Sequence, residues 1–228
     1  MKLPKETREA DSPHGRWYGD ACGTAFALEL LGERWSLLVV RELMFGPRRF
    51  SDIRASLPGI SAKTLAERLA SLESHGILAR HAATDAVPAQ LYGLTDWGHA
   101  AEPLIQELGR WAAASPLHDP TLPLSAASFM LSLRTMFDAA AAGDLAARIV
   151  FAIGTVRFTA HLADGALPVE RGEAAECELG ISAPSGSALA AVFYGDMPPA
   201  EVGVEVTGDP ELFETFRSLF ELPDKRPA

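Results

Sequence analysis

The chain has 228 residues, of which 48% are hydrophobic and 22% charged, enough for one large or two modest globular domains. Its net charge of −10 argues, on average, against a nucleic-acid partner. Two cysteines provide neither a disulfide framework nor a CxxC metal pair, and we expect no cofactor and no metal.

The charge is unevenly distributed along the chain. Residues 34–80 contain eight basic and four acidic residues, whereas residues 118–228 contain seven basic and sixteen acidic residues. Exposed charges more than about 10 Å apart are largely screened at physiological salt. A local basic patch in the first half can therefore bind DNA despite the acidic remainder.

Residues 1–20 are polar and irregular, which predicts a flexible tail. This segment lacks the apolar core of a signal peptide, and nowhere does the chain carry the ~18–20 apolar residues of a membrane span. The expected location is therefore cytoplasmic, without a membrane partner.

From Thr24 onward the apolar residues recur with helical period as far as Gly46-Pro47, and "FSDIRASL" predicts a short helix before Pro58-Gly59. The next segment, "GISAKTLAERLASLESHG", places three leucines on one helical stripe, with Ser61 as a suitable N-cap and Gly76 as a C-terminal glycine. Two short strands, "ILARHAA" and "AQLYGL", follow, and Thr95 is expected to cap one longer helix, "DWGHAAEPLIQELGRWAA".

This order of elements predicts a winged helix-turn-helix, with the segment at 59–76 as its recognition helix. A helix fits the major groove of B-DNA, and basic residues beside it neutralise phosphates. The alternative, a helix face that meets only water, is the commoner situation for any single amphipathic helix. The preceding turn, the following wing and the local excess of arginine favour DNA.

Residues 21–114 resemble the HxlR family of bacterial winged-helix regulators, which are relatives of the MarR type. The matching features are Cys22, Gly32-Glu33-Arg34-Trp35, Arg41-Glu42-Leu43, Gly46-Pro47, Arg49-Phe50, "LPGIS", Lys63, Leu65, Arg68-Leu69 and "YGLTDWG". The resemblance implies a homodimer that binds double-stranded DNA and whose dimer contacts come from the flanking helices.

The resemblance implies nine DNA-binding candidates. Lys63, Thr64 and Arg68 are expected to reach bases, and the remaining candidates are Ser61, Arg48, Arg49, Arg54, Arg80 and His81. The wing departs from the family pattern, because Ala89 stands where related sequences carry an arginine. This departure puts recognition of the minor groove in doubt, and Arg80 and His81 are the expected partial substitutes.

Cys22 is a candidate redox sensor, because some relatives use a cysteine at this position and a helix start lowers a thiol pKa. In this chain it precedes Gly23 rather than the proline usual in the family. Structural burial is the alternative role.

Three prolines at 116, 120 and 123 predict a linker at about 115–124, between a DNA-binding domain at 21–117 and a second domain at 118–228. In the second domain we expect one helix over "AASFMLSLRTMFDAAAAG", strands in "ARIVFAIGTVRFTAHLADG" and around 166–170, 177–182 and 202–206, and helices at "SALAAVFYG" and "PELFETFRSLF". The fold class is thus multidomain, with a mainly-α winged helix-turn-helix followed by an α+β domain.

No catalytic motif stands out in the second half, and the acids of "ERGEAAECE" suggest a solvated strand edge, so we expect no enzyme. The order of strands, the helix ending at Gly195 and the "VTGDP" stretch are similar to sterol-carrier-protein-like domains, which implies a tunnel for an apolar small-molecule effector. The candidate lining residues are Phe129, Leu133, Phe137, Phe151, Phe158, Phe193 and Phe216. Plain hydrophobic core is the alternative for these side chains.

The sequence therefore predicts a dimeric DNA-binding transcription regulator with an effector-binding C-terminal domain. One alternative is a lipid- or small-molecule-binding protein whose winged helix serves mainly for dimerisation. The excess of basic residues at 34–80 argues against it, because a dimer surface gains nothing from unpaired arginines.

Overall fold

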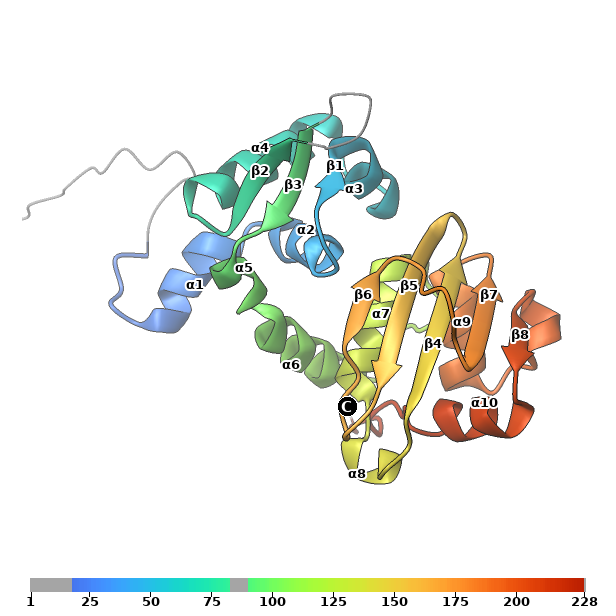
Figure 1. The fold of residues 1–228 in the computed structure, drawn as a ribbon. Helices are drawn as coiled ribbons and strands as arrows, with labels where there is room; N and C mark the ends of the chain where they lie inside the picture. The colour runs from blue at the N-terminus through green and yellow to red at the C-terminus, as the bar shows by residue number, and fades with distance from the viewer. Residues whose placement is uncertain (1–17, 83–89, 228) are drawn as a thin grey trace, which may run out of the picture.

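The computed structural model describes residues 18–82 and 90–227, so the expected tail at 1–20 lies almost wholly outside the described residues, as does Ala89. The chain forms a helical first half and a sheet-rich second half that pack against each other (Figure 1). The elements of the first half are α1 (Gly23–Leu31), α2 (Ser36–Leu43), β1 (Arg48–Arg49), α3 (Phe50–Ser56), α4 (Ala62–Ser74), β2 (Leu78–Ala82), β3 (Gln90–Leu94), α5 (Asp96–His99) and α6 (Glu102–Ala113).

Helix α4 forms where its leucine stripe and its terminal residues predict it. Leu65, Leu69 and Leu72 are almost fully buried, because their spacing of three and four residues brings them to one face of the helix. The Ser61 hydroxyl accepts a hydrogen bond from the backbone N–H of Thr64, which satisfies a donor that the helix itself leaves unpaired. At the other end, Gly76 adopts a positive φ of 71°, which reverses the chain into β2.

Strands β2 and β3 form an antiparallel ribbon, the wing, with Arg80 opposite Tyr92. The short strand β1 adds a third strand on the other side of β3, which the sequence did not predict. This pairing places Arg48 and Arg49 in register with Tyr92 and Leu91. The basic pair before α3 is thus fixed to the wing.

Two helices that the sequence predicts as continuous are each broken. The segment after Thr95 divides into α5 and α6, with Pro103 in the first turn of α6, because proline suits a helix start. The segment after residue 125 divides into α7 (Ala126–Met136) and α8 (Ala139–Ala142). Phe137 between them is extended, with a ψ of 126°, and forms a bridge to Phe220.

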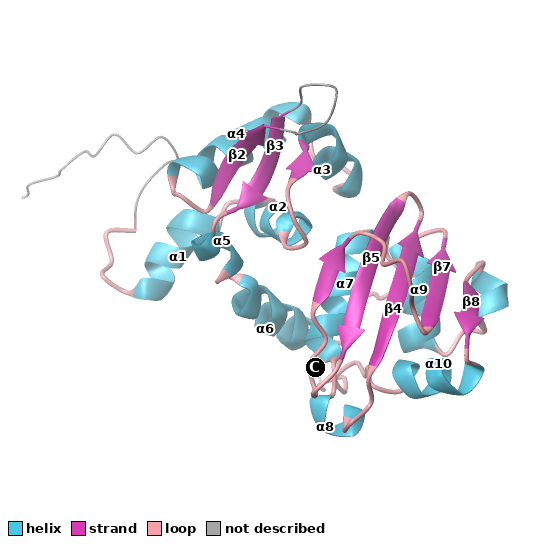
Figure 2. Cartoon of the chain, in the orientation of Figure 1, coloured by secondary structure: helices cyan, strands magenta, loops and turns pink. Residues whose placement is uncertain are grey.

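The second half is a five-stranded sheet. Helices cover one face of this sheet (Figure 2). After α7 and α8 the elements are β4 (Ala147–Ile153), β5 (Val156–Leu162), β6 (Val169–Arg171), β7 (Leu179–Ala183), α9 (Gly186–Gly195), a 3-10 helix (Pro199–Val202), β8 (Glu205–Gly208) and α10 (Pro210–Arg217). The strand order is β6-β5-β4-β7-β8, and only β4 and β7 run parallel. The predicted strands and helices fall close to these positions, with the last strand shifted toward the C-terminus.

The two halves share one continuous core rather than two separate ones. The ring of Phe45, just after α2, meets the ring of Phe158 on β5 edge-on, with centroids 5.4 Å apart. The C-terminal segment also returns to the first half, where the Lys225 ammonium donates to the carbonyls of Ala113 and Ser115 at the end of α6. A cation at this position complements the helix dipole.

Candidate nucleic-acid interface

The outer edge of α4 presents the polar residues that the recognition-helix hypothesis requires. The Lys63 side chain is 87% exposed, and its ammonium lies 3.9 Å from the carboxylate of Glu67 one turn later. The hydroxyls of Ser61 and Thr64 lie 2.8 Å apart at the start of the helix. Lys63 is therefore free to reach outward, while Ser61 is held in its capping role.

Arg68, on the same helix, is placed differently from Lys63. Its side chain is only 14% exposed, and its guanidinium lies 2.9 Å from the carboxylate of Glu33, between α1 and α2. The side chain thus ties the recognition helix to the rest of the domain. In this position the guanidinium is directed to Glu33 rather than outward, which disfavours the base contact expected from the sequence.

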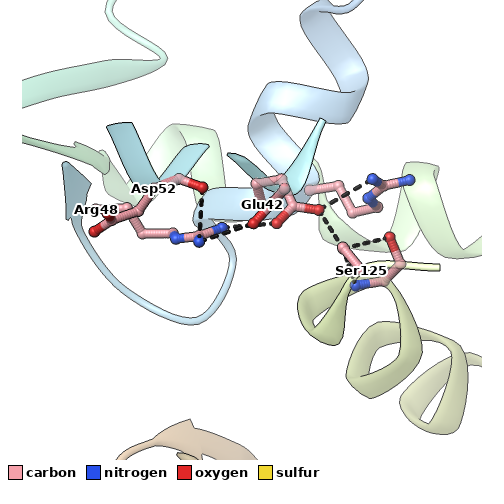
Figure 3. Close-up of polar contacts among 7 residues, drawn as sticks. Glu42, Arg48, Asp52 and Ser125 are labelled. Carbon is pink, nitrogen blue, oxygen red and sulfur yellow. Dashed lines mark hydrogen bonds and ion pairs between the residues drawn. The ribbon is translucent and has the colours of Figure 1, made fainter. Parts of the chain in front are cut away.

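Arg48 also has an internal role in the structure (Figure 3). It is 8% exposed and donates to the carboxylate of Glu42, the backbone carbonyl of Asp52 and the hydroxyl of Ser56. Glu42 itself is fully buried, and a buried carboxylate requires such partners. The phosphate contact expected of Arg48 is thus replaced by a buried ion pair.

The remaining basic candidates lie at or near the surface. Arg54 on α3 is exposed, and Arg49 is half-buried on β1. On the wing, the Arg80 guanidinium bonds the carboxylate of Glu73 at 2.8 Å and stacks over the Tyr92 ring. His81 follows Arg80 and is exposed. Of these residues, Arg80 contacts α4 directly, through Glu73.

A second surface feature is an apolar face shared by α1 and α6. Leu28 on α1 and Leu104, Leu108 and Trp111 on α6 expose between 49% and 78% of their surface. A groove of about 700 Å³ runs between the two helices, with these side chains along its walls. Exposed apolar surface of this extent typically marks an interface.

Cys22 lies directly before α1 and is exposed in the single chain, so the first half itself does not bury it. Hydrogen bonds from the backbone amides of Ala25 and then Thr24 lower the pKa of its thiol. The second cysteine, Cys177, is exposed in the other half of the chain.

Four of the seven candidate lining residues of the apolar pocket pack ring on ring: Phe129, Phe151, Phe193 and Phe216. The Phe193 ring has neighbouring ring centroids at 5.5–6.5 Å, including those of Phe129, Phe151 and Phe216. Phe158 and Leu133 are fully buried, and Phe137 packs on Phe220. The structure therefore favours the alternative that the sequence left open, a close-packed core.

The sequence did not predict the junction between the two halves. The Ser125 hydroxyl, which caps α7, donates to the buried carboxylate of Glu42 at 2.6 Å (Figure 3). Glu42 thus joins Arg41, Arg48 and the first turn of α7. An acidic residue inside the apolar repeat of "SLLVVRELMF" was the signal for a buried partner, but its partner 83 residues away was invisible in the sequence.

These observations define the first half as a winged helix-turn-helix of a DNA-binding protein. Residues 30–118 match the HxlR-like helix-turn-helix family. The HTH-type transcriptional regulator YvaP of Bacillus subtilis, itself uncharacterised, is 40% identical over 86 residues, which are 38% of this chain and 80% of that protein. YodB, an HTH-type transcriptional regulator of the same organism, is 42% identical over 38% of this chain and 77% of its own length.

The chain belongs to the HxlR-like helix-turn-helix family, through its first half. A solved structure of the reduced form of YodB from B. subtilis is 37% identical and has a TM-score of 0.39, covering 44% of this chain and all of that one. The relatives are transcriptional regulators of the HxlR and MarR-like kind, and transcription regulation through DNA binding follows for this chain.

Among the described residues, no helix is both long and apolar enough to cross a membrane. The same part of the chain contains no cluster of three or more histidine, cysteine or acidic side chains suited to a metal ion.

Proposed function

We propose that the protein is a homodimeric transcription regulator whose α4 helices enter the major groove of two successive half-sites. The observation that carries the proposal is the outer edge of α4, where the Lys63 side chain is 87% exposed and the part-buried Thr64 lies at the start of the helix beside Ser61. The N-terminal residues of a recognition helix are the ones that contact base edges.

In this proposal Lys63 and Thr64 contact bases, and Arg49, Arg54, Arg80 and His81 contact the phosphates on either side. The exposed positions of Arg54 on α3 and His81 on the wing support this assignment. Ser61 positions the start of the helix through its cap. Arg48 and Arg68 are left out, because their side chains are only 9% and 14% exposed, whereas that of Arg80, although paired with Glu73, is 45% exposed.

The proposed dimer forms through the apolar face of α1 and α6. A second copy of the chain is the proposed occupant, because this face adjoins the DNA-binding elements and two copies related by a twofold axis present two α4 helices to a palindromic operator. A solvent-exposed Trp111 is the kind of residue that anchors such an interface.

For the second half we propose a sterol-carrier-protein-like domain that senses a small molecule or supports the dimer. The order of strands around α9 and the Gly208-Asp209-Pro210 turn before α10 support the likeness. Because the phenylalanine cluster is filled, any effector must either displace core side chains or bind outside that cluster.

The test is fluorescence anisotropy of the purified protein with its own upstream intergenic duplex and a scrambled duplex, at two salt concentrations. We expect a preference of a hundredfold or more for the first duplex, within the specificity of ordinary regulators. Lys63→Ala should weaken binding to the operator by about 1–3 kcal/mol, whereas Arg148→Ala on the exposed side of β4 should leave it unchanged.

Equal and steeply salt-dependent binding to both duplexes would contradict sequence-specific recognition by α4. No binding to either duplex would favour the alternative, a small-molecule-binding protein whose winged helix serves mainly for dimerisation.

A further inference from the structure

A cleft of about 720 Å³ lies between the two halves of the chain. One wall consists of β1 and α3, with Arg48, Asp52 and Ser56, and of Leu91 on the wing. The other wall consists of the β4–β5 turn and the end of β6, with Arg157 and Arg171. The volume falls in the range of clefts that hold small molecules, roughly 300–1,000 Å³.

Three arginines that line this cleft differ in the acceptors and carboxylates that their guanidinium groups contact. Arg48 has its carboxylate partner in Glu42. Arg157 donates to the carbonyls of Gly154 and Val156 and lies 3.8 Å from the carboxylate of Glu173, a long ion pair at the surface. Arg171, at the end of β6, has neither an acceptor nor an ion pair among the described residues, and its Nε atom is buried without a hydrogen bond.

The lack of a hydrogen-bond acceptor at Arg171 is unusual because of what surrounds its guanidinium group. Its guanidinium lies over the face of the Phe158 ring, 4.8 Å from the centroid, so one side of the group is covered by apolar surface. Burial, followed by the repulsion of Arg48, lowers the pKa of Arg171 to about 10. A guanidinium carries five N–H donors and stays charged at neutral pH, and a buried N–H such as that at Nε of Arg171 is costly without an acceptor.

We propose that this cleft binds a small organic anion, a carboxylate or a phosphate monoester, through the unpartnered Arg171 with Arg157 as the second contact. A guanidinium fork matches the two oxygens of such a group and forms short, charge-assisted hydrogen bonds with it. The apolar walls from Leu91 and Val156 suit the carbon skeleton of the ligand.

The cleft also suggests what the ligand does, a step that rests on the proposed DNA-binding function. Arg48 and Asp52 border β1 and α3 of the helix-turn-helix, while Arg171 belongs to the sheet of the second half. A ligand that contacts both walls stabilises one relative position of the halves. The anion thereby alters operator affinity, because it binds one arrangement of the two halves better than others.

Binding is tested by isothermal titration calorimetry of the full chain with benzoate and with inorganic phosphate, at constant ionic strength. Benzoate represents the carboxylate class and phosphate the phosphate class. The test variant is Arg171→Met, which keeps a long apolar stem on Phe158 and removes every donor. Arg148→Met on β4 is the matched control, since it removes the same charge from an exposed position outside the cleft.

We expect at least one of the two anions to bind saturably, one per chain, to wild type and Arg148→Met. The affinity of Arg171→Met should be at least tenfold lower, because a hydrogen bond to a charged group contributes that factor or more. The proposed site is overturned if neither anion binds saturably, or if Arg171→Met binds the anion with the same affinity as wild type.

A ligand-free measurement separates a binding role of Arg171 from a structural one. Without added anion, Arg171→Met should melt at the same temperature as wild type or higher, because it removes a cation whose Nε–H is buried without an acceptor. A lower melting temperature would assign Arg171 to the fold and overturn the proposal.

Calorimetry involves no DNA, so its result is independent of the proposed regulator function. The regulatory step is tested separately by operator anisotropy with and without the binding anion. Operator affinity should change with the anion in wild type and stay constant in Arg171→Met; an unchanged wild-type affinity overturns the coupling between the halves.

Discussion

At the scale of single residues, two basic side chains of one helix illustrate how position decides role. Lys63 and Arg68 are both on α4, but the Lys63 side chain is 87% exposed and the Arg68 side chain 14%. Their sequence context is similar, and the difference arises only because Arg68 faces Glu33 at the α1–α2 junction. A positive charge on a recognition helix is therefore insufficient to assign a DNA contact.

This contrast leads to a prediction for Arg68. Arg68→Ala should lower the free energy of unfolding by about 1–2 kcal/mol, through loss of the ion pair and of the packing of its alkyl stem. The folded variant should still distinguish operator from scrambled duplex, unlike Lys63→Ala. Urea unfolding and anisotropy measure the two effects. If folded Arg68→Ala lost its preference for the operator, the result would show that Arg68 contacts a base.

Cys22 supports a second prediction at this scale. Its lowered thiol pKa leaves more reactive thiolate at neutral pH than an ordinary cysteine has. Diamide should therefore oxidise the Cys22 thiols of two protomers to one disulfide. The N=N bond of diamide takes up the two electrons and two protons that the thiols release. Formation of this disulfide should change operator affinity.

Cys22→Ser should abolish the effect of diamide, and Cys177→Ser, which removes the other exposed thiol, should retain it. Non-reducing electrophoresis identifies the covalent dimer, and anisotropy measures the affinity. If diamide leaves the affinity of wild type unchanged, Cys22 is no sensor.

At the scale of elements, α1 and α6 expose apolar side chains that neither half of the chain covers. Leu104 is 56% exposed and borders both the groove between these helices and the neighbouring hollow beside Trp97. Leu104→Glu should shift the protein from dimer to monomer, because a buried carboxylate without a partner costs several kcal/mol at an interface.

Leu122→Glu is the matched control, since Leu122 is 62% exposed in the segment between the halves, outside the groove. Sedimentation velocity measures the oligomeric state of both variants. A dimer that persists in Leu104→Glu would place the interface elsewhere.

At the scale of the whole molecule, the buried Glu42 links the DNA-binding half to the cap of α7. Glu42→Gln should destabilise the protein by roughly 3–5 kcal/mol, because Arg41 and Arg48 lose the charge that compensates theirs. Ser125→Ala should cost about 1 kcal/mol through loss of the cap.

The two substitutions test whether the halves are coupled. If the hydrogen bond between Ser125 and Glu42 carries coupling, a double-mutant cycle from urea unfolding should give about 0.5–3 kcal/mol of interaction energy between them. Additive effects would show that the halves contact each other without coupling at this point.

The sequence predicted best those features that depend on near neighbours. The leucine stripe of α4, its Ser61 cap and its Gly76 end are all local, because a helix is specified by residues three and four positions apart and by its two termini. The hairpin of the wing and the motifs of the HxlR family are local in the same sense. These features determined the helix-turn-helix and, through it, the class of the protein.

Tertiary structure alone decided which polar groups are free. Glu42 meets Ser125, 83 residues further along the chain, and Arg48 pairs with Glu42, whereas Arg171 pairs with no carboxylate in the part of the chain that the structure describes. The break at Phe137 likewise depends on its distant bridge to Phe220. Buried charges find their partners, and a core is filled, only when distant segments of the chain pack together. The hydrophobic periodicity of the sequence does not encode these contacts.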